Sequence, residues 1–229
     1  MVQDESSSKI LKILLKDLTI KPTITSLAKE IGLSRVGAWK LIKKMQYEKL
    51  IVLSKIGSGK TSAYSISLNF DNPLVEKNLA LSLTEDALKN QRWVSNFAEL
   101  ENKVEFLLLY GSIIISPQEA NDIDILGVVS NKNRFTEIEE SIKNMQKTQM
   151  KKIHAINFTP AEFRQELKRP NNALIDAVKK GTVLFGQEKF IKFVRGIIKT
   201  SKFHLCFISG LCVTSILHGI WMCSKITHQ

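Results

Sequence analysis

Hydrophobic residues follow a helical period in the first part of the chain. One apolar stripe consists of Ile10, Leu11, Ile13, Leu14 and Leu18. Spacings of three and four residues are typical of a helix with one buried face, and Ser8 is a suitable residue to cap its start. The pattern therefore predicts an amphipathic helix beginning near Ser8.

Two further helices are expected between Thr25 and Glu48. Thr25 is a candidate cap for a short helix ending near Ile31, Gly32 supplies a turn, and Ser34 can cap a second helix that ends near Glu48. Two helices joined by a short turn with glycine form a helix-turn-helix unit. The second helix has a predicted buried stripe of Ala38, Ile42 and Met45, and its other faces carry Arg35, Lys40, Lys43 and Lys44.

Residues 50–68 change to the alternating period of strands. The segments "LIVLSKI" and "AYSISL" predict two strands, and "GSGKTS" predicts the hairpin turn between them. The end of this turn, Gly59-Lys60-Thr61, matches the last part of a phosphate-binding P-loop. That motif needs a glycine at the position of Ser54 and a helix after the lysine, whereas a strand follows here, so the P-loop interpretation is rejected.

The order of these elements resembles winged helix-turn-helix domains, including the repressor domain of biotin-protein ligases. The resemblance covers about residues 9–70, with Lys49 where the family usually has a helix-ending glycine. It implies binding of double-stranded DNA through the second helix and the hairpin, by Arg35, Lys40, Lys43, Lys44, Lys55 and Lys60. The alternative is a winged helix that pairs with a second copy and forms a homodimer.

Residues 73–103 have a helical pattern of leucines among acids and amides, which predicts a helical connector of one or two helices. The pattern changes again at Val104, where "VEFLLLY" predicts a buried strand. Gly111 and Ser112 follow this strand directly, and a second strand, "IDILGVV", contains Asp122 and Asp124. Residues two apart on a strand point to the same face, so both carboxylates are expected to converge near the Gly-Ser turn. Two carboxylates side by side suit a hard cation such as Mg²⁺.

This arrangement of strand, Gly-Ser, short excursion and Asp-x-Asp strand resembles the nucleotidyltransferase superfamily that includes DNA polymerase beta. It is most similar to the minimal nucleotidyltransferases of prokaryotes, over about residues 95–195. The resemblance implies that Gly111 and Ser112 hold the phosphates of an NTP, ATP being the first choice, and that Asp122 and Asp124 hold Mg²⁺. It further implies transfer of a nucleoside monophosphate to an acceptor hydroxyl, and a partner protein of the toxin-antitoxin type.

The chain departs from that family where a third carboxylate is expected on a later strand. The strand "KKIHAINFT" offers His154, or Asn157 in a shifted register, and the next acids are Glu162 and Glu166 on the following helix. Thr159 to Glu162 has the sequence of a capping box, which gives Glu162 a structural role. His154 could serve as a base or as a metal ligand. The alternative to an enzyme is a DNA-binding regulator, or an antitoxin-like protein, whose nucleotidyltransferase fold is catalytically impaired.

Charge is distributed unevenly over the chain. The net charge is +11 overall, with +6 over residues 1–72, −5 over 73–129 and +7 over 130–195. A basic first segment suits a polyanionic partner, whereas the acidic segment contains the Asp-x-Asp strand. The polar, acidic opening "MVQDESSS" is unlike a secretory signal, so a cytoplasmic location is expected.

The last segment, residues 196–229, is apolar and contains no acid. Residues 203–223 carry no formal charge and approach the ~20 residues of a membrane span. A membrane anchor, a packed helix and a tail that is not native to the domain all fit this composition. The sequence thus predicts an α+β protein in four segments: a winged helix-turn-helix (1–72), a helical connector (73–103), a small mixed-sheet nucleotidyltransferase-fold domain (104–195) and an apolar tail (196–229).

Overall fold

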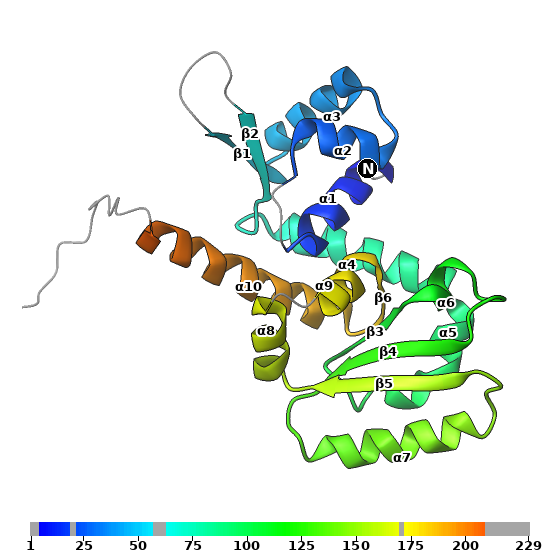
Figure 1. The fold of residues 1–229 in the computed structure, drawn as a ribbon. Coiled ribbons are helices and arrows are strands. Elements are labelled where there is room, and N and C mark those ends of the chain that lie inside the picture. The colour runs from blue at the N-terminus through cyan, green and yellow to red at the C-terminus, as the bar shows by residue number, and fades with distance from the viewer. Residues whose placement is uncertain (1–4, 19–21, 57–62, 170–171, 209–229) are drawn as a thin grey trace, which may run out of the picture.

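The computed structural model describes residues 5–18, 22–56, 63–169 and 172–208, and this part of the chain has an α+β fold with two sheets (Figure 1). The N-terminal part comprises α1 (Glu5–Lys16), α2 (Ile24–Ile31), α3 (Arg35–Tyr47), β1 (Ile51–Ile56) and β2 (Ala63–Leu68). The connector comprises α4 (Pro73–Lys89), α5 (Gln91–Asn96) and the 3-10 turn η1 (Ala98–Leu100). The remaining elements are β3 (Phe106–Tyr110), α6 (Ser112–Ile115), β4 (Asp122–Val128), α7 (Arg134–Gln146), β5 (Lys152–Phe158), α8 (Pro160–Lys168), α9 (Asn172–Lys180), β6 (Thr182–Phe185) and α10 (Gln187–Ile208).

The expected starts of the first two helices were wrong by a few residues. α1 begins at Glu5, so Ser8 lies inside the helix and does not cap it. α2 is capped by Thr23 and not by Thr25, because the Thr23 side chain accepts a hydrogen bond from the Ser26 amide while the Ser26 hydroxyl accepts one from the Thr23 amide. Thr25 lies inside α2, and the reciprocal hydrogen bonds with Ser26 identify Thr23 as the cap.

The expectations for α3 are confirmed. Ser34 caps the helix by accepting a hydrogen bond from the Gly37 amide at 3.1 Å, and Ala38, Ile42 and Met45 are fully buried. Lys49, beyond the helix end, has a φ of 57°, in the left-handed region where glycine is common.

β1 and β2 form the expected antiparallel hairpin, in which Lys55 pairs with Tyr64. The turn between these strands, including Gly57, Gly59 and Lys60, lies outside the described residues.

The connector contains two α-helices followed by η1. α4 is central to the fold, since it contacts α1, α10 and β6 (Figure 1). Its start is defined by Asn72, whose side chain accepts a hydrogen bond from the Leu74 amide, and by Pro73 in the first turn.

The larger sheet has the strand order β5-β4-β3-β6, with β4 and β5 parallel and the other neighbours antiparallel. Helices cover both of its faces. One face carries Phe106, Leu108 and Leu126, which pack against α4, α8, α9 and α10. The opposite face carries Leu107 and Ile125, which pack with residues of α5, α6 and α7.

The N-terminal part shares its hydrophobic core with the first of these faces. A single cluster of buried side chains extends from Ile10 and Ile42 through Leu79 of α4 to Leu108 and Phe190. Ion pairs attach α4 to both sides: Lys12 of α1 pairs with Asp86 at 2.6 Å, and Arg195 of α10 pairs with Glu76. The parts expected as separate domains are therefore packed together across α4.

α10 is continuous from Gln187 to Ile208, so the boundary expected at residue 195 falls inside a helix. Within the described residues, no helix has the length and apolar character needed to cross a bilayer. Residues 209–229 of the apolar tail lie outside the described part.

Candidate functional site

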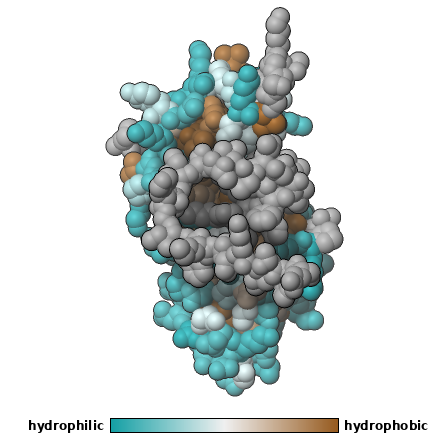
Figure 2. All heavy atoms as spheres, turned by 90° about the vertical axis from the view of Figure 1, so that its left-hand side faces the viewer, coloured by the Kyte–Doolittle hydropathy of each residue, from teal (hydrophilic) through white to brown (hydrophobic). Residues whose placement is uncertain are grey.

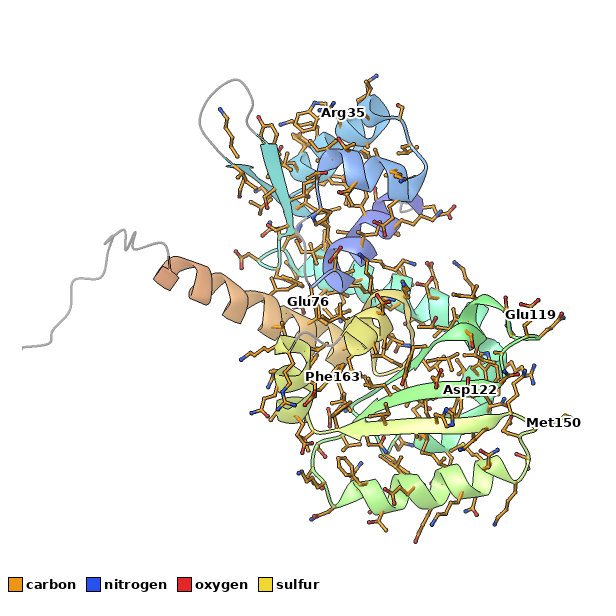
Figure 3. The ribbon with its side chains drawn as sticks, in the orientation of Figure 1. Arg35, Glu76, Glu119, Asp122, Met150 and Phe163 are labelled. Carbon is orange, nitrogen blue, oxygen red and sulfur yellow. The ribbon has the colours of Figure 1, made fainter. Side chains whose placement is uncertain are left out.

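Three strand ends meet at one edge of the larger sheet. β3 ends at Tyr110, antiparallel β4 begins at Asp122, and parallel β5 begins at Lys152. The register places Asp124 directly between Tyr110 on β3 and His154 on β5. Backbone pairing therefore fixes which side chains are neighbours here. Asp122 lies near the start of β4, remote from Arg35 on α3 (Figure 3).

Asp122, Asp124 and His154 form a cluster on one sheet face, as the two-residue period predicted. His154 Nδ1 lies 3.4 Å from Asp122 Oδ2 and 3.5 Å from Asp124 Oδ1, and one ligand atom of each residue lies within 4.8 Å of the others. Farther along, this face is buried under helices, but at this edge the three side chains are 36%, 24% and 44% exposed, respectively. The cluster is partly enclosed yet reachable from solvent.

The electrostatic surroundings of Asp124 disfavour its charged form. Burial raises the pKa of its carboxyl group, the neighbouring charge of Asp122 raises that pKa further, and His154 partly opposes both effects. Among the described residues, neither carboxylate forms an ion pair with lysine or arginine. The pKa of the Tyr110 hydroxyl is also raised, first by burial and then by the charge of Asp124. A bound cation would relieve this concentration of negative charge.

Gly111 is required by the geometry of the cluster. Its φ is 82°, and a Cβ atom placed on it would lie 2.4 Å from Asp124 Oδ2. A side chain here would be strained by the backbone and would displace the carboxylate. Ser112 follows at the start of the one-turn helix α6 and is exposed.

The alternatives to His154 as the third group do not reach the cluster. Asn157 pairs with Gly127, so the shifted register considered from the sequence is wrong. Glu162 lies beyond the opposite end of β5, where it forms the expected capping box with Thr159 and an ion pair of 2.6 Å with Lys132. These bonds, that of Lys132 foremost, lower the pKa of Glu162 to about 2. Glu166 on the same helix pairs with Arg169.

No protein-family model, curated protein or solved structure matches this chain. The geometry of its own residues therefore carries the functional argument.

The second set of candidate residues lies on the N-terminal part. Arg35, Lys40, Lys43 and Lys44 of α3 and Lys55 of β1 are all exposed, whereas Lys60 lies outside the described residues. Lys43 is positioned 4.8 Å from the centre of the Trp39 ring and donates a hydrogen bond to Gln46. On the side of the molecule shown in Figure 2, the lower part is mainly hydrophilic, and hydrophobic residues are scattered over the upper, N-terminal part.

Sequence reasoning missed an aromatic pair beside these cations. The rings of Trp39 on α3 and Tyr64 on β2 lie 5.5 Å apart, and with Arg35, Val36 and nearby residues of α2 they line a depression of about 570 Å³. The period of α3 separates Trp39 from the buried stripe, but its contact with Tyr64, 25 positions later on β2, depends on tertiary packing and cannot be predicted from that period. Tyr110 was also missed, although its place at a strand end beside Gly111 was a usable signal.

Proposed function

We propose that the protein is a nucleotidyltransferase that also binds DNA. In this proposal, residues 104–195 form a nucleotidyltransferase-fold domain and residues 1–72 a winged helix-turn-helix. The observation that carries it is the convergence of Asp122 and Asp124 on one strand face beside Gly111, whose side-chain position is taken by Asp124 Oδ2. This matches what the resemblance to the DNA polymerase beta superfamily implies.

The residues present fit a divalent cation. Two carboxylates without a lysine or arginine partner in the described structure, one of them with a raised pKa, form a donor set that a cation would stabilise. When bound, the cation would polarise the α-phosphate of an NTP and neutralise charge on the attacking and leaving oxygens. Asp122 and Asp124 would hold it, and Mg²⁺ is the ion that the resemblance implies.

The remaining residues around the cluster would bind and position the substrate. Gly111 is exposed at the turn beside Asp124, and exposed Ser112 offers a hydroxyl next to it. We propose that Gly111 and Ser112 bind the phosphates of the NTP. Tyr110 borders the carboxylates on the third strand and would help to exclude water from one side.

A turnover assay tests this proposal. The full chain is incubated with α-labelled ATP and a divalent cation, together with protein, tRNA and small hydroxyl acceptors. We expect labelled product from the wild type and none from Asp122→Asn/Asp124→Asn. The matched control is Glu139→Gln/Glu140→Gln, which removes two exposed charges from α7 and should retain activity. Equal product from the wild type and the Asp122/Asp124 variant would contradict the proposal.

A DNA-binding regulator that holds nucleotide without turnover is the second candidate. It is favoured by a specific observation: the cluster contains two carboxylates and a histidine, and within the described residues no third carboxylate joins it. Cation-dependent NTP binding without product from any acceptor would support this candidate over the enzyme.

A further inference from the structure

The third member of the cluster is an imidazole and not a carboxylate. His154 is held by the parallel pairing of β5 with β4, directly opposite Asp124, so its place does not depend on a flexible loop. Its Nδ1 faces one oxygen of each carboxylate at nearly equal distances, 3.4 Å and 3.5 Å. A small adjustment of the three side chains would bring these atoms around one ion.

The mixed donor set has a chemical consequence. Mg²⁺ is a hard ion that takes oxygen ligands and retains water, whereas imidazole nitrogen is a good ligand for first-row transition metals. Exchanging a carboxylate for an imidazole also removes one negative charge from the site, which weakens the attraction for Mg²⁺ most, because that attraction is mainly electrostatic. The nitrogen bond partly replaces this loss only for a transition metal.

We propose that Asp122, Asp124 and His154 together bind a divalent transition-metal ion in preference to Mg²⁺, with His154 Nδ1 as a direct ligand. This inference rests on the cation site of the proposed function and specifies which ion it takes. The three residues leave open positions on an octahedral ion, and these suit phosphate oxygens of a nucleotide.

Mn²⁺ is the probe of choice, because its binding is observed directly by electron paramagnetic resonance in the full-length protein. Wild-type protein with ¹⁵N-labelled histidine should show a hyperfine coupling between bound Mn²⁺ and one imidazole nitrogen. The coupling should disappear in His154→Ala and in His154→Gln, and Mn²⁺ affinity should fall by about tenfold or more, which corresponds to about 1.4 kcal/mol. His154 is 44% exposed, so neither change is expected to prevent folding.

Mg²⁺ competition separates a metal preference of this site from the general tendency of Mn²⁺ to bind more tightly. His154→Asp restores a third carboxylate, so the ratio of Mn²⁺ to Mg²⁺ affinity should fall by about tenfold relative to wild type. The control Glu139→Gln/Glu140→Gln should leave the ratio unchanged. An unchanged ratio in His154→Asp, or absence of histidine coupling in wild type, would overturn the proposal.

The outcomes distinguish this inference from the proposed function. If Mn²⁺ couples to His154 but no NTP binds with the metal, the metal preference stands and the nucleotidyltransferase proposal falls. If NTP binds with Mg²⁺ through Asp122 and Asp124 and His154→Ala changes nothing, the inference falls alone. If wild type binds neither ion, both fall.

Discussion

At the residue scale, the candidate site depends on the missing side chain of Gly111. Gly111→Ala adds a Cβ atom at a φ of 82° and 2.4 Å from Asp124 Oδ2. We expect a loss of about 1–3 kcal/mol in the free energy of unfolding, because few L residues adopt this backbone conformation, and a weaker affinity for divalent cations. Denaturant unfolding and metal titration measure the two effects.

Gly196→Ala is the matched control for this change. Gly196 lies within α10, where a Cβ atom would meet its nearest neighbour at 4.0 Å, so alanine should be neutral or stabilising. Equal stability and equal cation affinity of Gly111→Ala and wild type would show that the close approach to Asp124 has no role.

The sequence was enough to predict that Asp122 and Asp124 belong to one cluster, but not to predict the strand register that adds His154 to it. The two-residue period of a strand placed Asp122 and Asp124 on one face without any knowledge of neighbouring strands. Choosing His154 over Asn157 required the alignment of β5 with β4, which is set by the packing of α7 and by pairing along the whole strand. Local spacing contains no information on that alignment.

At the element scale, α3 is the proposed DNA-contacting helix. Its cations lie outside the buried stripe, and Arg35 is at its N-terminal end. Replacing Arg35, Lys40 and Lys43 with alanine should weaken duplex binding and reduce its dependence on salt. A protein that contacts fewer phosphates releases fewer counterions from the DNA when it binds. Fluorescence anisotropy with a labelled duplex at several salt concentrations measures both quantities.

Other results would contradict the proposal that α3 contacts DNA. Salt-independent or undetectable duplex binding by wild type, together with a dimer in sedimentation that the triple variant disrupts, would favour the dimerisation alternative. The triple variant should unfold at the same denaturant concentration as wild type, because the three side chains belong to the exposed or polar faces of the helix.

Helices and strands were predictable where the apolar residues keep one period over the whole element. The buried stripe of α3 and the hairpin of β1 and β2 follow directly from their periods, whereas the starts of α1 and α2 did not. Several residues able to cap stand close together around the start of each helix, including Thr23 and Thr25, and the period of the stripe does not choose between them.

At the scale of the whole molecule, the unexpected feature is the core shared between the N-terminal part and the larger sheet. Sequence periods show which faces are apolar but not which faces meet, so they do not predict that the two parts share one cluster of buried side chains. Lys16 lies at this junction, and its ammonium group donates a hydrogen bond of 2.6 Å to the Gly181 carbonyl.

Lys16 makes the folding stability of the protein depend on pH. Burial, the largest cause, lowers its pKa from about 10.5 to about 8, and Lys12 adds to this while Asp86 opposes it. Between pH 8 and 10.5 the unfolded chain holds a proton that the folded chain has lost, so the contribution of Lys16 to stability rises with pH. Below pH 8 both states are charged and the full penalty of burial applies.

We expect the unfolding free energy of wild type, minus that of Lys16→Met, to rise by about 1–3 kcal/mol from pH 8 to 10.5, a range that allows for partial exposure. Subtracting the variant removes the contribution of the other titrating groups. Stability curves that stay parallel over this range would contradict the assigned burial of Lys16.

The central claim is that Asp122 and Asp124 form a cation-dependent nucleotide site, and calorimetric titration of NTP tests it most directly. Wild type and the Glu139→Gln/Glu140→Gln control should bind NTP only when a divalent cation is present. Asp122→Asn/Asp124→Asn should show no binding under either condition, since its site has lost both charges. NTP binding that is equal with and without the cation, or unchanged in the Asp122→Asn/Asp124→Asn variant, would contradict the account.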